Sequence, residues 1–264
     1  MAELIELIDG SVSLPAAVHR PAQRGPWPGI VLGPGGLGKG NIRDMDWLAN
    51  PLAAAGFMVV TITYRAAYPG DDNRDFGLGL DVLQKDPDVD QSRIALIGSS
   101  RGGMSALRTA ALDSRVRAVV GLAPPCDMKH NVRGTQLYAP MRHQTQLVMM
   151  GGEPDEVPER YELVQAISYA DRIKVPVLLV HGLFDLHAPP EMSIYMERAL
   201  RRAGHTEVTL ELLEGLGHFW ERTHLGDEHY RVVNIVMQWL VKTLRCTQPT
   251  PSMEAPRSNR AVGC

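Results

Sequence analysis

The stretch RIALIGSSRGGMSAL, residues 93–107, joins a short apolar run to a helical pattern through the turn GSSRG, residues 98–102. This is the G-x-S-x-G pattern in a strand–turn–helix context, which presents a serine at the tip of a strained turn. Glycine is needed at positions 98 and 102 because a Cβ there would crowd the turn. The following helix directs the N–H groups of its first turn at the same point, where negative charge is favoured. The stretch therefore predicts an α/β fold with Ser100 as a nucleophile, and for the pentapeptide alone an ordinary βα turn is the alternative.

Short apolar runs alternate with helical patterns on both sides of this turn. Such alternation is typical of a mostly parallel sheet covered by helices on both faces. We expect parallel strands over 28–33, 57–64, 93–98, 116–123, 175–182 and 206–215, and two antiparallel edge strands over 3–8 and 13–19. Helices are expected over 43–55, 73–85, 101–112, 190–203 and 228–245, where apolar residues recur three and four apart. The sequence thus indicates one domain over residues 1–246 with about eight strands.

The connection between residues 123 and 175 departs from this pattern. It is about fifty residues long and shows no strong strand, and connections of this length usually form lids or contain helices of their own. We expect a small cap insertion over about 126–172, with a helix near 156–167. The end of the chain, 247–264, has three prolines and few large apolar residues, so we expect a disordered tail there.

Composition and charge exclude several classes of protein. The 264 residues carry a formal net charge of −3, from 27 basic and 30 acidic residues, which gives no basic surface for nucleic acid or an anionic membrane. No apolar run approaches the roughly 20 residues of a membrane span. The start, MAELIELIDG, is acidic where a signal peptide is basic. Cys126, Cys246 and Cys264 are too few and too scattered for a disulfide framework, so we expect a cytoplasmic protein.

An activated serine needs a base, and the base needs an orienting acid. In a sheet of this kind the three follow in the order Ser, Asp or Glu, His. VPVLLVHGLFDLHAPPE, residues 175–191, places Asp185 three residues beyond a strand end at residue 182. ELLEGLGHFWER, residues 211–222, places His218 in a glycine-rich turn after the next strand. We predict Ser100, Asp185 and His218 as a catalytic triad.

Other residues compete for two of these positions. Asp185 has the alternative of capping the helix that begins near residue 190, and Asp127 is the alternative acid. His224 and His229 are alternative bases, although their position near a helix start favours a solvated surface. A zinc site from residues 218, 221 and 224 does not match the ligand spacings that zinc proteins use. We expect no metal.

The segment IVLGPGGLGKGN, residues 30–41, matches two phosphate-binding patterns in part. A triphosphate loop needs Ser or Thr after the lysine, and Gly40 stands there. A dinucleotide-binding loop requires an acidic residue at the end of the next strand, but the residue after the strand over 57–64 is Arg65. An arginine at this position suits only a 2′-phosphate, as in NADP. The same loop is suited to hold the oxyanion of an acyl transfer, with the N–H of Gly36 (or Leu37) as one donor and the N–H of Arg101 as the other.

Taken together, these stretches resemble the α/β-hydrolase superfamily. The closer likeness is to the catalytic domains of prolyl-oligopeptidase-like and acylaminoacyl-peptidase-like serine hydrolases, with dienelactone hydrolases as a neighbouring branch. Four segments carry it: VVTITYRAA, VDQSRIALIGSSRGGMSAL, ISYADRIKVPVLLVHGLFDLHAPPE and LLEGLGHFW, within residues 25–243. The resemblance implies an α/β-hydrolase fold, with Ser100 as nucleophile, Asp185 as acid, His218 as base and Gly36 as an oxyanion donor.

The sequence departs from these relatives at three points. The oxyanion loop has Pro34-Gly35-Gly36 where the family often has His-Gly-Gly. About 25 residues precede the core, so we expect no propeller of the kind that gates oligopeptidases. Dienelactone hydrolases have a cysteine where this chain has Ser100.

The predicted function is acyl-enzyme hydrolysis of a small carboxylic ester, thioester or lactone, without a cofactor. An exopeptidase or amidase is the alternative of the same chemistry, and an NADP-binding oxidoreductase or a non-catalytic binding domain is the alternative from another class. The expected partner is a small acyl substrate, and the sequence does not decide the oligomeric state. Candidate pocket residues are Leu37, Tyr64 and Trp220, together with Met45 and the pair at 149–150.

Overall fold

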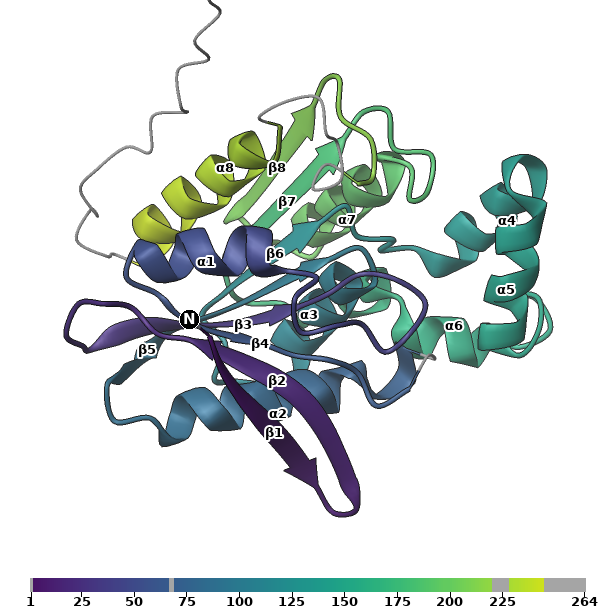
Figure 1. Ribbon diagram of the computed structural model, residues 1–264. Coiled ribbons are helices and arrows are strands. Elements are labelled where there is room, and N and C mark those ends of the chain that lie inside the picture. Colours follow the sequence, from purple (N-terminus) through teal and green to yellow (C-terminus); the bar gives the residue numbers. More distant parts are fainter. Residues whose placement is uncertain (1, 67–68, 220–227, 245–264) are drawn as a thin grey trace, which may run out of the picture.

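The computed structural model describes residues 2–66, 69–219 and 228–244. Its centre is an eight-stranded sheet in the order β1-β2-β4-β3-β5-β6-β7-β8 (Figure 1). The strands are β1 Glu3–Asp9, β2 Val12–His19, β3 Trp27–Gly33, β4 Met58–Thr61, β5 Val89–Ser99, β6 Ala118–Leu122, β7 Val177–Gly182 and β8 Val208–Leu213. From β4 to β8 all neighbours are parallel, and β1 and β2 form an antiparallel hairpin at one edge.

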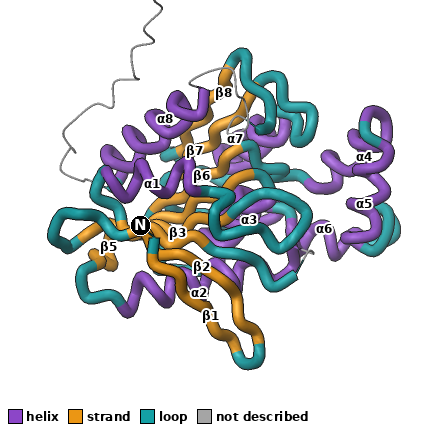
Figure 2. Tube along the Cα trace, viewed as in Figure 1, coloured by secondary structure: helices purple, strands orange, loops and turns teal. Residues whose placement is uncertain are grey.

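Helices cover both faces of this sheet (Figure 2). They are α1 Asp46–Ala54, α2 Asp72–Lys85, α3 Arg101–Leu112, α4 Met128–Tyr138, α5 Pro140–Met150, α6 Pro158–Val164, α7 Glu191–Arg202 and α8 Glu228–Thr243, with short 3₁₀ turns at Pro69–Asp71 and Ala166–Tyr169. Apolar residues of α1 and α8 pack on one face, and those of α2, α3 and α7 pack on the other. Each face of the sheet therefore has its own hydrophobic core.

Strands β3 and β6 and the second half of β5 are almost entirely apolar because both of their faces are buried. In β5, Ile94 and Leu96 contribute to one core, whereas Ala95 and Ile97 contribute to the other. This follows from the alternation of side chains along a strand. The arrangement fixes the carboxyl end of β5, and with it the turn that begins at Gly98.

The cap leaves the sheet after β6 and returns to it before β7. Helices α4, α5 and α6 project to one side of the sheet in Figure 1. α4 and α5 form a hairpin held by the hydrogen bond from the Thr135 hydroxyl to the side-chain Oε1 of Gln146, 2.9 Å, while the backbone oxygen of Val132 lies 3.0 Å from His143 Nδ1. The buried side chain of Tyr161 in α6 joins the larger core. The cap is thus packed on the domain at its base.

These observations confirm the predicted fold, a mostly parallel eight-stranded sheet with helices on both faces. All eight expected strands and all six expected helices are present, with ends shifted by a few residues. The expected strand over 57–64 ends at Thr61, and the one over 93–98 begins earlier, at Val89. The tail over 247–264 lies outside the described residues. Among the helices described, none has the length and apolar character that crossing a membrane requires.

Candidate active site

Ser100 lies between the end of β5 and the start of α3, with a backbone φ of +51° and ψ of −116°. This is a strained conformation for a residue with a Cβ. It is fixed by close packing around the turn: a Cβ on Gly98 would overlap the backbone of Gly102, and a Cβ on Gly102 would overlap the carbonyl oxygen of Gly33. The Ser100 N–H also donates to Leu122 O, 2.7 Å away. The two glycines are therefore required for the reason that the sequence indicates.

The three predicted triad side chains form one hydrogen-bonded chain. His218 Nε2 lies 3.0 Å from Ser100 Oγ, and His218 Nδ1 lies 2.6 Å from Asp185 Oδ2. With Nδ1 protonated toward the carboxylate, Nε2 is left to accept the serine proton, which is the tautomer that a general base needs. The side chains of His218 and Asp185 are almost fully buried. Residues from three separate loops thus meet in a geometry suited to nucleophilic catalysis, and their catalytic roles stay predictions.

The carboxylate of Asp185 is held on both oxygens. Its Oδ1 accepts from the backbone N–H groups of His187 and Ala188, at 2.8 and 2.9 Å. Burial alone would raise the pKa of Asp185, but hydrogen bonds from His181 and His218, the charge of His218 and the Ala188 N–H together lower it well below its usual value. The group therefore stays ionised, as an orienting acid must. The Asp185 carboxylate thus stabilises its own turn through Oδ1 and contacts His218 through Oδ2.

His181, at the end of β7, is a supporting residue that the sequence interpretation missed. Its Nε2 lies 3.2 Å from Asp185 Oδ2 and 2.6 Å from Ala188 O, and its Nδ1 lies 2.7 Å from Ser193 Oγ. The ring is completely buried. A proton on Nε2 then serves both acceptors, while Nδ1 accepts from the serine hydroxyl. The spacing His-Gly-x-x-Asp was visible in the sequence, but the direction of the ring was not.

Two aromatic side chains enclose the ring of His218. His187 stacks on it at 5.3 Å between ring centroids, and Phe219 meets it edge-on at 4.9 Å. Burial, together with the positive charges of Arg142 and His218, lowers the pKa of His187. His187 therefore stays neutral beside His218 and does not oppose the positive charge that a catalytic imidazole acquires.

The glycine-rich loop passes directly beside the nucleophile. A Cβ on Gly35 would lie 3.1 Å from the Cβ of Ser100, and Gly36 has a φ of +98°, a conformation that favours glycine. Arg101 is the first residue of α3, and N–H groups in a first turn have no intrahelical acceptor. Both predicted oxyanion donors are thus neighbours of Ser100, and their function as donors stays a prediction.

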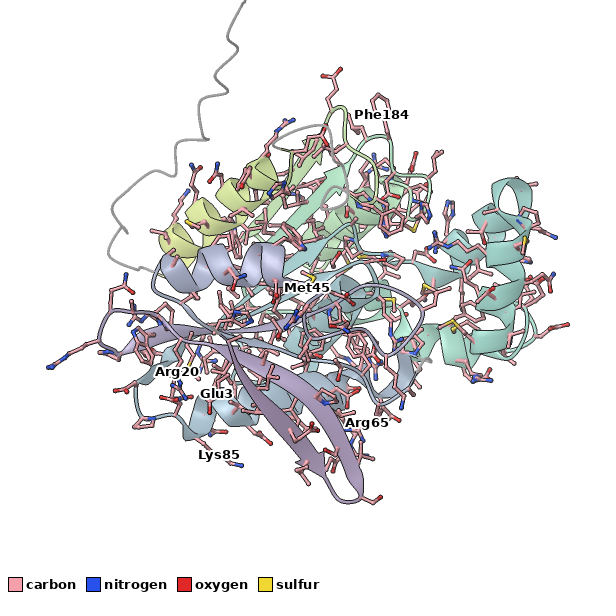
Figure 3. All side chains as sticks on the ribbon, in the orientation of Figure 1. Glu3, Arg20, Met45, Arg65, Lys85 and Phe184 are labelled. Atoms are coloured by element: carbon pink, nitrogen blue, oxygen red, sulfur yellow. The ribbon has the colours of Figure 1, made fainter. Side chains whose placement is uncertain are left out.

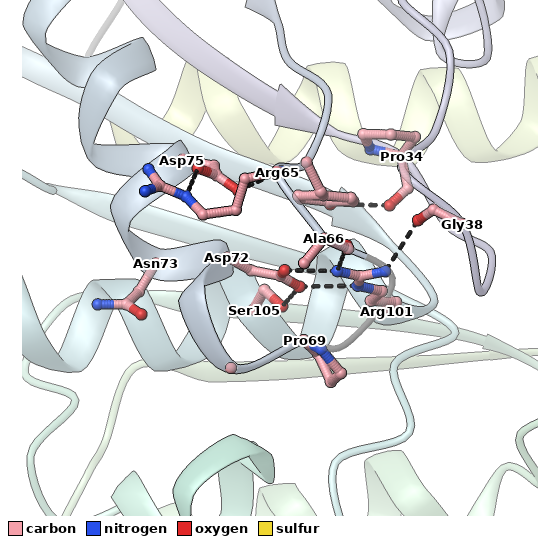
Figure 4. A network of polar contacts seen from close by, with 12 residues as sticks. Pro34, Gly38, Arg65, Ala66, Pro69, Asp72, Asn73, Asp75, Arg101 and Ser105 are labelled. Carbon is pink, nitrogen blue, oxygen red and sulfur yellow. Dashed lines mark hydrogen bonds and ion pairs between the residues drawn. The ribbon is translucent and has the colours of Figure 1, made fainter. Parts of the chain in front are cut away.

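The side chain of Arg101 has a second role, which the sequence did not indicate. Its guanidinium makes two bonds to Asp72, Nε to Oδ2 at 2.9 Å and Nη2 to Oδ1 at 2.6 Å (Figure 4). It also donates to Gly38 O and Ala66 O, each at 2.8 Å. The Ser105 hydroxyl completes the set by donating to Asp72 Oδ2 at 2.7 Å. The residue that follows the nucleophile therefore ties the glycine-rich loop to α2 and α3.

Tyr64 belongs to the same support and is not among the residues that line the two cavities beside Ser100, and its predicted part in substrate binding stays a prediction. The residue is completely buried, its hydroxyl donates to Pro34 O at 2.8 Å, and its backbone N–H donates to Lys39 O at 2.8 Å. The Arg101 guanidinium lies 4.5 Å from the centre of its ring. Burial raises the pKa of Tyr64 well above its usual value, so the hydroxyl stays protonated as a donor. Tyr64 therefore binds the glycine-rich loop at two points, Pro34 and Lys39.

A cavity of about 320 Å³ opens beside Ser100 and His218. Most of its wall is apolar, and the cap supplies much of it. Leu37 lines this cavity, as do Met149 and Met150, whereas Trp220 lies outside the described residues. Met45 lines a second hollow of about 310 Å³ that also reaches Ser100 and His218. Substrate binding by Leu37 stays a prediction.

The alternative triad residues have other partners or lie outside the description. Asp127 caps α4, because its Oδ1 accepts from the His130 N–H at 2.9 Å. His229 lies in the first turn of α8 with its ring against Tyr230. His224 and the glutamate at 221 fall among the residues not described. No group of three potential metal ligands occurs within the described part of the chain.

Arg65, on which an NADP site would depend, is already paired. It lies beside the β1–β2 hairpin (Figure 3), where its Nη1 contacts Asp9 Oδ2 at 2.8 Å and its Nε contacts Asp75 Oδ1 at 2.6 Å. Two carboxylates around this guanidinium disfavour a phosphate there. The glycine-rich loop instead faces the nucleophile.

Comparison with known proteins agrees with this geometry. The sequence profile of the prolyl oligopeptidase family matches residues 43–247. The chain belongs to that family. Membership supports an enzyme of the serine hydrolase type, and it does not separate an esterase from a peptidase. The predicted resemblance to prolyl-oligopeptidase-like catalytic domains is thereby confirmed.

Individual relatives include proteins named as peptidases and as esterases. The uncharacterised peptidase YtmA of Bacillus subtilis is 28% identical over 231 residues, which are 83% of this chain and 85% of that protein. The acylaminoacyl peptidase of Pyrococcus horikoshii superimposes with a TM-score of 0.78 at 17% identity, covering 96% of this chain but 43% of the peptidase. A thermophilic esterase of Thermogutta terrifontis, Est2, superimposes with a TM-score of 0.73 at 18% identity and 95% coverage of both chains. At such identities the structural likeness shows the α/β-hydrolase fold alone.

Proposed function

We propose that this protein is a serine hydrolase that cleaves a carboxylic ester, thioester or lactone through an acyl-enzyme. The observation that carries the proposal is the chain from Ser100 Oγ through His218 to Asp185, with distances of 3.0 and 2.6 Å, at the edge of a largely apolar cavity. Each contact lies within the range that proton transfer requires.

The proposed reaction has two acyl-transfer steps. His218 Nε2 takes the proton of Ser100 as Oγ attacks the carbonyl carbon, and the oxyanion is held by the N–H groups of Gly36 and Arg101. His218 then gives its proton to the leaving alcohol or thiol as the carbon–oxygen or carbon–sulfur bond breaks. Water, activated by the same imidazole, attacks the acyl-enzyme and releases the acid. Asp185 stabilises the imidazolium in both steps.

An exopeptidase or amidase is the second candidate, because the family and the Bacillus relative are named for peptidases. The chemistry differs only in the leaving group, an amine that must be protonated as it departs. An esterase is our first choice because Est2, of which this chain covers 95%, is named an esterase. The NADP alternative loses its main support because Arg65 is paired with two carboxylates.

Labelling with a fluorophosphonate probe tests the nucleophile. We expect wild-type protein to be labelled and Ser100→Ala not to be labelled. Kinetics on p-nitrophenyl esters and on aminoacyl anilides then separate the two candidates, with kcat/KM for the esters expected to be the larger. Labelling of a folded Ser100→Ala variant, or hydrolysis that survives in it, would show that another residue carries the reaction.

A further inference from the structure

Asn131, in the first turn of α4, lies in the wall of the cavity that contains Ser100 and His218. Its side chain is 1% exposed, and neither its amide nitrogen nor its amide oxygen has a hydrogen-bond partner among the described residues. Buried polar groups in folded proteins are nearly always paired, since an unpaired one loses its hydration without compensation. An unpartnered amide beside a substrate cavity therefore indicates a ligand group that pairs with it.

Two further N–H donors line the same cavity from α5. Arg142 and Gln146 are four residues apart, so they lie on one face of the helix. The amide oxygen of Gln146 accepts from the Thr135 hydroxyl at 2.9 Å, which leaves the amide nitrogen as the group with hydrogen atoms to donate. The cap thus presents Asn131, Arg142 and Gln146 to the cavity, and donors outnumber acceptors among them.

The charge of the cavity has one sign. Among the described residues that line it there is no Asp or Glu, and its arginines are Arg101 and Arg142. The charge of Arg142 reaches His187, whose pKa is lowered by burial and then by this arginine. A negatively charged group is therefore favoured in this cavity over a positively charged one.

Four methionines also line the cavity. Met104, Met128, Met149 and Met150 line the cavity, and unbranched thioether side chains rearrange readily around an aliphatic chain. Rearrangement of these side chains would give a ligand access to the buried amide. The cavity is therefore suited to a short apolar chain with a polar end.

We propose that the preferred substrates carry a carboxylate at the end of the acyl group remote from the scissile carbonyl, bound by Asn131, Arg142 and Gln146. Both oxygens of a carboxylate accept hydrogen bonds, so it can accept from all three donors. A carboxamide has one acceptor oxygen, and its NH₂ group is itself a donor. This inference rests on the proposed serine-hydrolase function and adds the class of acyl group to it.

The test compares p-nitrophenyl esters of equal acyl length: the glutaryl half-ester, the valeryl ester and the glutaramyl ester. Rates are taken above the enzyme-free rate, because a free carboxylate assists hydrolysis of its own ester. Hydrogen bonds to a charged group predict a kcat/KM for the glutaryl ester about tenfold or more above that for the valeryl ester. Equal values for these two esters, or equal values for the glutaryl and glutaramyl esters, would overturn the proposal.

Variants locate the effect. We expect Asn131→Leu and Arg142→Met each to remove most of the preference for the glutaryl ester, read as the ratio of kcat/KM for the glutaryl ester to that for the valeryl ester within each variant. Arg133→Met is the matched control: it removes a cation from the same cap, but Arg133 pairs with Asp155 and does not line the cavity. Loss of the preference in Arg133→Met alone would contradict the assignment.

Hydrolysis of the valeryl ester that is lost in Ser100→Ala tests the serine-hydrolase function alone, without the carboxylate. The proposed function and the proposed acyl group can therefore fail separately. If no ester is hydrolysed, the proposed function fails, and calorimetric binding of glutarate and valerate to Ser100→Ala still decides the inference. Binding of glutarate about tenfold or more tighter than valerate supports it. Equal or undetectable binding of both acids overturns it.

Discussion

Replacement of Arg101 by methionine tests whether the side chain next to the nucleophile holds the glycine-rich loop. Arg101 and Asp72 form a paired and almost fully buried contact, with side chains 6% and 2% exposed. Removal of one partner of such a pair leaves a buried charge uncompensated and costs about 3–5 kcal/mol. For a domain of this size, each 1 kcal/mol lowers Tm by about 2–4 °C, so we expect a fall of about 6–20 °C.

The catalytic effect of Arg101→Met is expected to fall on kcat. The variant keeps the N–H of residue 101 but loses the bond from the guanidinium to Gly38 O, which fixes the loop that carries Gly36. If Gly36 no longer reaches the oxyanion, the loss approaches that of one oxyanion donor, about 10²–10³ in kcat. KM is expected to change little, because the ground-state ester does not use this contact. The assay is kcat per fluorophosphonate-reactive site, measured well below the lowered Tm.

A double variant separates stability from catalysis. In Arg101→Met with Asp72→Asn the buried charge is gone, so we expect much of the lost Tm to return while kcat stays low. Arg115→Met is the matched control, because Arg115 pairs with Asp81 and Asp113 at a partly exposed site and its loss is worth about 0–1 kcal/mol. Recovery of both Tm and kcat in the double variant, or a normal kcat per reactive site in Arg101→Met, would refute the idea that this side chain positions the loop.

Three further predictions concern single residues. Gly98→Ala is expected to lose both labelling by fluorophosphonate and most of its folding yield, since the added Cβ overlaps Gly102; a labelled and stable variant would show that the turn relaxes. The folded pKa of Asp185 lies below its unfolded value of about 3.9, so its contribution to stability is present above that pH and is lost as pH falls through the folded pKa. The Tm difference between wild type and Asp185→Asn should therefore be largest near neutrality and shrink below about pH 4, and a constant difference in thermal scans would contradict this. Burial raises the pKa of Cys126, so mass spectrometry after iodoacetamide treatment should find this thiol modified only in unfolded protein, and modification of the native protein would argue against its burial.

The sheet and the triad were predictable because local patterns determine them. The second half of β5, residues 94–97, is an uninterrupted apolar run followed by Gly98, and both features follow from burial on two faces and a crowded turn. The order of Ser100, Asp185 and His218 places each after a different parallel strand, and the carboxyl ends of such strands share one edge of the sheet. Their convergence therefore needed no knowledge of side-chain directions.

The cap was predicted only in part, for a physical reason. α4 and α5 carry large apolar side chains on their outer surfaces, with Leu137 89% and Met141 86% exposed, so their apolar residues do not mark one buried face. The helix that was expected, near 156–167, corresponds to α6, which packs on the core. Periodicity identifies a helix only where burial is one-sided.

Tyr64 shows a second limit of prediction from the sequence, which concerns the direction of a side chain. It follows the end of β4, where the alternation of side chains along a strand stops and no longer tells which way a ring points. From the sequence, an aromatic residue near the nucleophile is compatible with a pocket wall or with a buried support, and the bond from its hydroxyl to Pro34 O appears only in the structure. His181 is similar, since its role depends on a ring orientation that is set by Ser193 and Ala188.

The site thus has two kinds of support, and they predict different consequences of mutation. Arg101, Asp72 and Tyr64 hold the loop and the turn from within the sheet-and-helix core, where replacement leaves buried charges or unpaired donors. Asn131 and Arg142 reach the cavity from the cap. Changes in the first group should therefore lower kcat for every substrate together with Tm. Changes in the second should redistribute kcat/KM among acyl groups with little loss of stability, so that the cap sets selectivity while the core maintains the chemistry.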